Sequence, residues 1–208
     1  MNETVFILAP HTDDGELGCG GTMAKLVAEG KNVFYIAFST CSVSLPKNLP
    51  FDTLKNECTA AVQTLAIPDQ NLIFFNFEVR RLLFHRQEIL EELIKLNKQY
   101  QPATVLLPAE NDIHQDHQAI YSEGMRAFRN ANLLGYELPW NNYRFQPNYF
   151  EKISDDNLQA KINALSQYKS QANRKYMNEN FIRSLATVRG LQANTPFAEA
   201  FEAYRLTS

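Results

Sequence analysis

The sequence predicts an α/β protein with a mainly parallel β-sheet that is covered by helices on both faces. Apolar runs of strand length recur through the first half of the chain, and a stretch with helical spacing follows each of them. Strands that alternate with helices of about 10–15 residues are typical of parallel sheets joined by crossover connections. Polar clusters directly follow two of the apolar runs, at the strand ends where open sheets of this class bind their ligands.

Four strands and the helices between them follow from the residue pattern. Buried strands are predicted at residues 5–8, 32–39, 72–77 and 104–108. Helices are predicted at residues 22–29, 52–65 and 86–100. A further helix starts at Asp112, with Gln115 in a capping-box position, or at Asp116. The earlier start would put His114 and His117 on one helical face.

The last third of the chain has a different pattern. Residues 136–149 include two prolines and three asparagines, and residues 155–168 and 174–188 have the pattern of polar-faced helices. We expect these segments to pack around the ligand crevice. With 45% hydrophobic residues and no linker or repeat, residues 1–208 are predicted to fold as one domain with a Rossmann-like three-layer sandwich.

Composition excludes several classes of function. The formal net charge of −3, without a basic stripe, argues against a nucleic-acid partner. The three cysteines, Cys19, Cys41 and Cys58, have no C-x-x-C spacing, which fits a reducing compartment. Residues 1–9 lack the features of a signal peptide, and no apolar run is long enough to span a membrane. We therefore expect a cytoplasmic protein and leave open whether it forms a homo-oligomer.

Two polar clusters carry the candidate chemistry. The first strand ends in a loop with His11, Asp13 and Asp14, and two neighbouring carboxylates beside a histidine favour a bound cation. The fourth strand leads into a second cluster, which begins at His114 and ends at His117. Because both clusters follow strands, we expect them to meet across one crevice.

These motifs resemble a known family of enzymes. His-Thr-Asp-Asp-Gly-Glu at 11–16 and His-Gln-Asp-His at 114–117 are similar to the motifs of the LmbE-like or PIG-L family of zinc-dependent sugar N-deacetylases. The tail around 189–190 and 198–201 resembles the family as well. Family members more often carry proline at the position of Thr12, which affects loop stiffness and no ligand.

The resemblance implies the metal ligands and the base. It assigns His11, Asp14 and His117 to zinc, a set of two imidazoles and one carboxylate that leaves a position open for water. Ferrous iron accepts the same ligands. Asp13 is then free to act as the general base for metal-bound water that attacks the amide of an N-acetylglucosamine-type conjugate.

Three further groups of residues have expected roles. We expect His114, protonated and held by Asp116, to stabilise the oxyanion that forms during attack. Glu16 is a candidate for a supporting hydrogen bond to a ligand or to the loop. Arg80 and Arg81 are candidates for an anionic group of the substrate, and Trp140 for a contact with the sugar. The substrate is thus expected to be a small N-acetyl sugar conjugate.

A dinucleotide-binding fold does not fit the first loop. Gly18-x-Gly20 begins a dinucleotide fingerprint, but Met23 stands at its third position, and the carboxylates of the loop would repel a pyrophosphate. Two alternatives stay open: a non-catalytic metal- or glycan-binding protein of the same fold, and a hydrolase of another small amide or ester. The presence of Asp13 beside the three predicted ligands argues against a protein that only binds a metal or glycan, because binding requires no general base.

Overall fold

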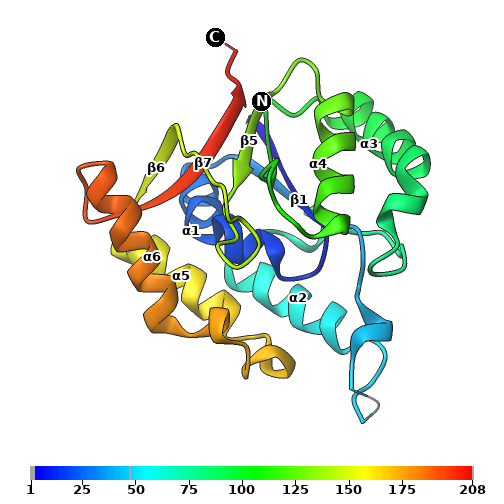
Figure 1. Cartoon of the computed structure of the whole chain (residues 1–208), viewed down its shortest axis with the longest axis horizontal. Coiled ribbons are helices and arrows are strands. Elements are labelled where there is room, and N and C mark those ends of the chain that lie inside the picture. Colours follow the sequence, from blue (N-terminus) through cyan, green and yellow to red (C-terminus); the bar gives the residue numbers. More distant parts are fainter. Residues whose placement is uncertain (1–2, 47, 208) are drawn as a thin grey trace.

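One mixed sheet forms the centre of the molecule. The structure is a computed structural model and describes residues 3–46 and 48–207. In these residues seven strands pair in the order β3-β2-β1-β4-β5-β7-β6 (Figure 1). The strands are β1 Thr4–Ala9, β2 Asn32–Ala37, β3 Leu72–Phe74, β4 Thr104–Pro108, β5 Asn132–Tyr136, β6 Tyr149–Ile153 and β7 Phe197–Arg205. The strands β1 to β5 pair in parallel, whereas β7 runs antiparallel to both β5 and β6.

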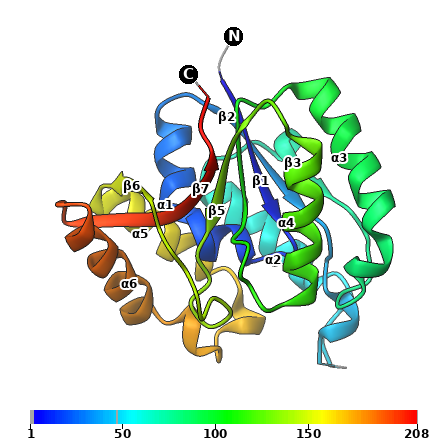
Figure 2. The same ribbon diagram turned by 45° about the horizontal axis from the view of Figure 1, so that its top comes forward.

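Helices cover both faces of the sheet. They are α1 Asp14–Ala28, α2 Thr53–Thr64, α3 Arg86–Tyr100, α4 Gln115–Ala127, α5 Asp155–Leu165 and α6 Glu179–Gln192. Figures 1 and 2 show α3 and α4 on one side of the sheet and α1, α2 and α5 on the other, with α6 beside β7. This arrangement confirms the predicted three-layer fold with a mostly parallel sheet.

The core is divided into two parts by the sheet. Along β1, Val5 and Ile7 point into the cluster with α1, α2 and α5, whereas Phe6 and Leu8 point into the cluster with α3 and α4. All four side chains are buried. Burial on both faces explains why this strand is an unbroken apolar run in the sequence.

The glycine-rich segment after β1 is helical, contrary to the predicted loop. The helix α1 begins at Asp14 and has a kink at Cys19, where φ is −146°. A Cβ at Gly15 would lie 2.5 Å from the Tyr35 ring, and one at Gly18 would lie 2.3 Å from the Tyr136 ring. These glycines thus let the helix approach the sheet closely, at a cost in helix propensity.

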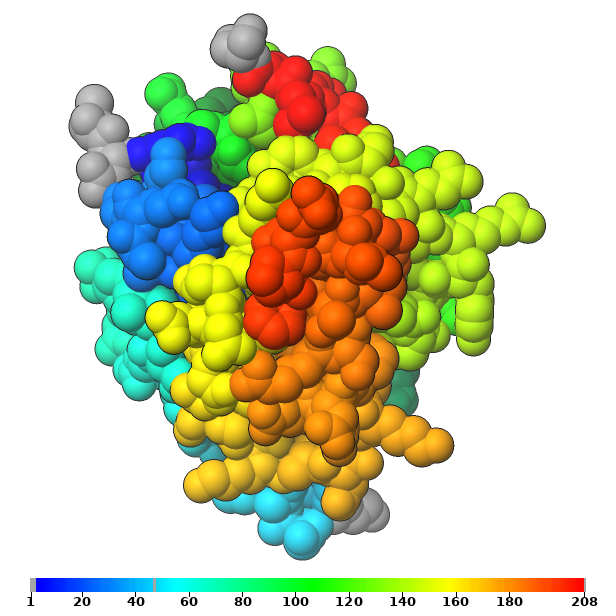
Figure 3. All heavy atoms as spheres, turned by 90° about the vertical axis from the view of Figure 1, so that its left-hand side faces the viewer, coloured from blue at the N-terminus to red at the C-terminus, as the bar shows by residue number. Residues whose placement is uncertain are grey.

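The C-terminal third completes the sheet, which the sequence pattern did not predict. Strands β5, β6 and β7 were missed, and α6 lies at Glu179–Gln192 instead of at 174–188. Figure 3 shows that this part of the chain, in yellow to red, covers one side of the molecule. Among the described residues, no helix is long and apolar enough to cross a membrane.

Candidate metal centre and active site

The two polar clusters meet at the carboxyl ends of β1 and β4. These strands are neighbours in parallel register, with Ile7 opposite Leu106, so the segments that follow them leave the sheet at the same edge. A cavity of about 480 Å³ opens there, and side chains of both clusters line it. The predicted convergence of the two clusters is therefore present in the structure.

Three ligand atoms form a nearly regular triangle. Asp14 Oδ2 lies 3.0 Å from His11 Nδ1 and 3.2 Å from His117 Nε2, and these two nitrogens lie 3.2 Å apart. Nitrogen and oxygen ligands about 2.0–2.1 Å from a tetrahedral zinc are about 3.3 Å from one another. The donor set and its spacing therefore fit one face of a tetrahedral metal site.

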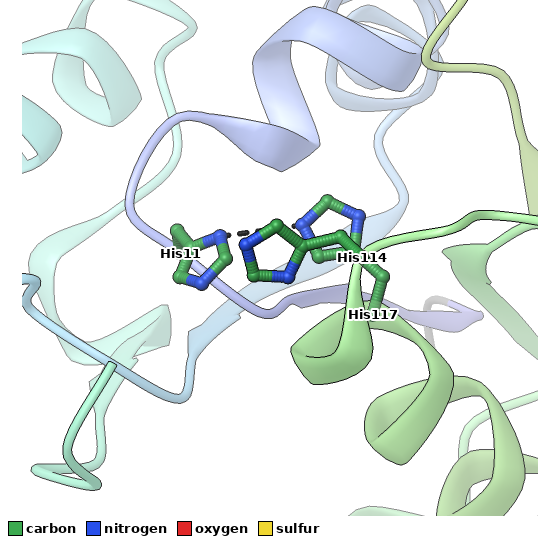
Figure 4. Close-up of side chains that lie close together, drawn as sticks. All are labelled: His11, His114 and His117. Carbon is green, nitrogen blue, oxygen red and sulfur yellow. Dashed lines mark hydrogen bonds between the residues drawn. The ribbon is translucent and has the colours of Figure 1, made fainter. Parts of the chain in front are cut away.

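A third histidine completes the cluster. Figure 4 shows His11, His114 and His117 gathered together, with a dashed line for the contact between His11 and His117. Ligand atoms of the three rings all lie within 4.8 Å of one another. His114 therefore lies within reach of a group bound at the triangle.

Each histidine of the triangle is oriented by a carboxylate on its far side. Asp116 Oδ2 lies 2.9 Å from His11 Nε2, and Asp112 Oδ2 lies 2.7 Å from His117 Nδ1. Such outer carboxylates fix the ring tautomer and make the metal-facing nitrogen a better ligand. The sequence pattern predicts Asp112 only as a helix start, although its position between β4 and the second cluster is compatible with a supporting role.

The predicted pairing of Asp116 with the His114 ring is wrong. The Asp116 carboxylate binds His11 and also accepts the backbone N–H groups of Arg80 and Leu82, at 2.5 Å and 3.1 Å. The helix α4 starts at Gln115, between the two predicted starts, and His114 is its N-cap. Because the carboxylate is used elsewhere, it does not hold the His114 ring.

His114 is also neutral, contrary to expectation. Its Nδ1 accepts the Asp116 N–H at 3.2 Å, which leaves the ring proton on Nε2. Burial and the charges of His117 and His11 lower the pKa of His114 to about 4. A neutral imidazole can still donate Nε2–H to a developing oxyanion.

The charges around the triangle favour a cation. Burial alone would lower the pKa values of His11 and His117, but the negative charge of Asp14 and the carboxylate hydrogen bonds raise them to about 9 and about 10. Burial would raise the pKa of Asp14, yet the charges of the two histidines hold it well below its usual value. Positive charge is thus favoured at the position where a metal ion would lie.

Asp13 is a carboxylate outside the triangle. It precedes α1, but its side chain makes no capping hydrogen bond, and it lines the cavity. Burial and the charge of Asp14 raise the pKa of Asp13 to about 6. A carboxylate with increased proton affinity next to a candidate metal site is suited to proton transfer.

Glu16 supports the first loop through two buried tyrosines. Its carboxyl group is fully buried and contacts the hydroxyls of Tyr35 and Tyr168. Both hydroxyls also reach the carbonyl oxygen of Thr12, between two residues of the site. Burial raises the pKa of Glu16 to about 8. Glu16 therefore contacts neighbouring aromatic residues and belongs to the scaffold of the loop.

Of the three candidate substrate residues, two line the cavity and one does not. Arg80 and Trp140 line the cavity, and the Trp140 ring stacks on Tyr176 with centroids 4.2 Å apart. Arg81 is not part of the cavity wall. Its side chain is 56% exposed, lies 3.8 Å from Glu78 and covers a neighbouring phenylalanine ring.

Comparison with known proteins agrees with this architecture. Residues 6–128, more than half of the chain, match the family model described as PIG-L: GlcNAc-PI de-N-acetylase. The Escherichia coli (strain K12) protein described as the uncharacterized deacetylase YaiS is 28% identical over 172 residues, which cover 80% of this chain and 90% of that protein. Diacetylchitobiose deacetylase of Thermococcus kodakarensis is 24% identical over 220 residues, with 94% of this chain and 80% of that protein covered.

A solved structure shares the whole fold. The conserved protein TT1542 from Thermus thermophilus superposes with a TM-score of 0.81 at 24% identity, over 100% of this chain and 97% of the other. The family match spans both polar clusters, and the fold continues beyond it to the C-terminal strand β7. The chain belongs to the PIG-L, or LmbE-like, family of deacetylases.

Proposed function

We propose that this protein is a metal-dependent hydrolase that removes the acetyl group from an N-acetylated sugar conjugate. The observation that carries the proposal is the ligand triangle of His11, Asp14 and His117, with the Asp13 carboxylate on the same cavity wall. Within residues 3–46 and 48–207, no side chain donates a hydrogen bond to this carboxylate. A site built for binding alone has no need for this additional carboxylate. The deacetylase family of the chain supports the same reaction class.

The donor set favours zinc as the metal. Two imidazole nitrogens and one carboxylate oxygen are typical ligands of catalytic zinc, and ferrous iron accepts them too. Held by His11 Nδ1, Asp14 Oδ2 and His117 Nε2, a divalent ion would polarise the acetyl carbonyl and make a water molecule more acidic. The outer carboxylates of Asp112 and Asp116 would keep both rings in the ligating tautomer.

The chain supplies the proton transfers. Asp13 takes a proton from the attacking water as the C–O bond forms, and then gives it to the sugar nitrogen as the C–N bond breaks. The Nε2–H of His114 donates a hydrogen bond to the carbonyl oxygen, which becomes negative during attack. The products are acetate and the free amino sugar.

Two observations support a sugar as the substrate. The stacked Trp140 and Tyr176 rings form an aromatic wall beside the site, and a sugar ring can pack its apolar face on such a surface. One relative is described as a diacetylchitobiose deacetylase. A preference for simple acetamides or esters over N-acetylglucosamine conjugates in an acetate-release assay would overturn the sugar assignment.

The test is the variant Asp13→Asn, compared with Asp156→Asn on the exposed surface of α5. We expect the first variant to keep about one metal ion per chain by elemental analysis and to lose about 10²–10⁴-fold in acetate release. The second should behave as the wild type. Full activity of Asp13→Asn would contradict the assigned base. Complete inactivity of the metal-loaded wild type on all N-acetyl sugars, amides and esters would favour a non-catalytic binding protein.

A further inference from the structure

We propose that the buried ion pair between Lys161 and Glu199 positions the active site by holding the kink in α1. This inference rests on the proposed function, because it gives the ion pair a role in placing the base Asp13 and the metal ligand Asp14. Lys161 lies on α5 and Glu199 on β7, both in the C-terminal third of the chain. Lys161 Nζ and Glu199 Oε1 lie 2.6 Å apart, and the two side chains are only 7% and 5% exposed.

The kink divides α1 into two parts. Cys19 has φ −146° and ψ 27°, which lie outside the helical range. The helix contains no proline, which is a common cause of kinks. Another cause is a side chain that inserts into the i→i−4 hydrogen-bond ladder of the helix. The side chains that bind the backbone near Cys19 therefore decide how the kink is held.

The ion pair binds the backbone of α1 on both sides of the kink. Lys161 Nζ donates to the carbonyl oxygen of Leu17 at 2.8 Å. Glu199 accepts the backbone N–H groups of Gly21 and Thr22, at 3.0 Å and 2.6 Å. In a regular helix the Gly21 N–H would bind the Leu17 carbonyl oxygen, because these residues are four positions apart. The two charged side chains thus bind the donor and the acceptor of one helical rung, and their own contact links them.

Two glycines of α1 leave room for these side chains. A Cβ at Gly20 would lie 2.9 Å from Lys161 Cγ, and the three atoms nearest to it all belong to Lys161. A Cβ at Gly21 would approach Glu199 Oε1 to 3.3 Å. Glycine within a helix lowers helix stability, and here it lets the ion pair reach the backbone.

The short part of α1 before the kink carries the chemistry. Asp14 Oδ2 is one corner of the ligand triangle, and the Asp13 carbonyl oxygen accepts the Leu17 N–H at 3.1 Å. The carbonyl oxygen of the same Leu17 binds Lys161. A change in the kink would therefore move Asp13 and Asp14 relative to His117, which lies on α4.

Stability alone is a weak reason for this arrangement. A buried ion pair loses the hydration of both charges, and its replacement by apolar residues of similar volume is often neutral or stabilising. Buried ionic groups can instead fix one conformation. The conformation fixed here is the one in which Asp14 reaches the two ligand histidines.

The main test variant is Glu199→Gln, which keeps the size of the side chain. Glu199 Oε1 accepts from Gly21 and Lys161, and Oε2 accepts from Thr22. A glutamine has a single oxygen, so its NH₂ group must face one of these donors. One part of the contact with α1 is lost in either orientation of the amide.

Glu137→Gln is the matched control. It makes the same change in a second buried carboxylate, which is 7% exposed and pairs with Arg189 of α6. The control thus removes a buried ion pair that does not involve α1. A second variant, Gly20→Ala, acts from the other side of the contact. It raises helix propensity, while its methyl group displaces Lys161.

The first readout is zinc affinity, from competition with a chromophoric chelator under conditions where urea unfolding shows each variant to be fully folded. A loss of global stability alone leaves the zinc affinity of the folded protein unchanged. The second readout is kcat and KM for acetate release from N-acetylglucosamine at saturating zinc. These readouts separate positioning of the site from simple destabilisation.

We expect Glu199→Gln to bind zinc about tenfold or more weakly than the wild type, as the loss of a group that orients a ligand does. Its kcat should fall about 10²-fold with little change in KM, because the base is misplaced while the substrate wall is intact. Gly20→Ala should change both quantities in the same direction. Glu137→Gln should keep the zinc affinity of the wild type even where its stability is lower.

Zinc affinity and kcat of Glu199→Gln equal to those of the wild type would overturn the inference and leave the proposed deacetylation standing. If Glu199→Gln does not fold, Gly20→Ala decides: weaker zinc binding supports the inference, and wild-type binding refutes it. If the wild type binds zinc but releases no acetate from any N-acetyl sugar, amide or ester, the proposed function fails. The zinc affinities of the variants then decide the inference by themselves.

Discussion

Replacement of Asp112 by asparagine should weaken metal binding by about ten- to a hundredfold without changing the size of the side chain. Two short hydrogen bonds hold the Asp112 carboxylate: Oδ2 accepts from His117 Nδ1 at 2.7 Å, and Oδ1 accepts from the backbone N–H of His114 at 2.8 Å. Asn141 Nδ2 adds a longer one to Oδ2, at 3.5 Å. Asp112 and His117 are both almost fully buried, so water cannot easily replace a lost bond.

An asparagine at position 112 has only one oxygen for the two short hydrogen bonds. If that oxygen faces the His114 N–H, the amide NH₂ faces His117 Nδ1, which must then be unprotonated. The His117 proton would move to Nε2, the atom that belongs to the ligand triangle. If the amide is turned the other way, the His114 N–H loses its acceptor. A hundredfold loss in affinity corresponds to about 2.8 kcal/mol.

The assay is competition for zinc between the protein and a chromophoric chelator at neutral pH. Asp156→Asn is the control, because it makes the same chemical change on an exposed surface. Far-UV circular dichroism would show that both variants are folded. If Asp112→Asn bound zinc as tightly as the control, the assigned role of Asp112 in orienting His117 would be refuted.

Two further predictions concern stability. Without a bound metal, the pKa of His11 is raised from 6.5 to about 9 and that of His117 from 6.5 to about 10. Folding therefore takes up protons at pH values between about 6.5 and 10. Their contribution to stability is complete below about pH 6.5 and is lost as the pH rises through 9 to 10. Urea unfolding should therefore show a free energy that falls over this interval, while zinc affinity rises because the metal displaces these protons; a flat stability profile would contradict the raised values. Lys161→Met should destabilise the protein by about 3–5 kcal/mol in urea unfolding, because the buried Lys161 Nζ lies 2.6 Å from Glu199 Oε1 and its loss leaves that charge uncompensated. An unfolding midpoint equal to that of the wild type would argue against this reason.

Much of the parallel half of the fold could be predicted from the sequence. The strands β1, β2 and β4 are buried on both faces, so their apolar runs are nearly continuous and easy to identify. The helix α3 has the predicted bounds because its apolar spacing is regular and a proline follows soon after its end. These features depend on local residue order, which is why a single sequence was sufficient.

The candidate site was only partly predictable. His11 and His117 follow strands that pair with each other, so their convergence followed from the rule that ligands bind at strand ends. The orientation of their rings did not follow, because it depends on which carboxylate lies behind each ring. Asp116 lies close in sequence to His114 but binds His11, and Asp112, which orients His117, has no special spacing.

The tertiary structure alone decided the remaining features. Strand β7 pairs with β5 from a distant part of the chain, and its sequence has no strong apolar run that would mark it as a strand. Arg174 lines the cavity because the segment between α5 and α6 packs against the first loop, where the Tyr168 hydroxyl contacts the Thr12 carbonyl oxygen. The sequence by itself thus determined the parallel sheet and the chemical groups of the site, since these depend on local pattern. Long-range packing decided which groups touch, because contact depends on distances that residue order does not specify.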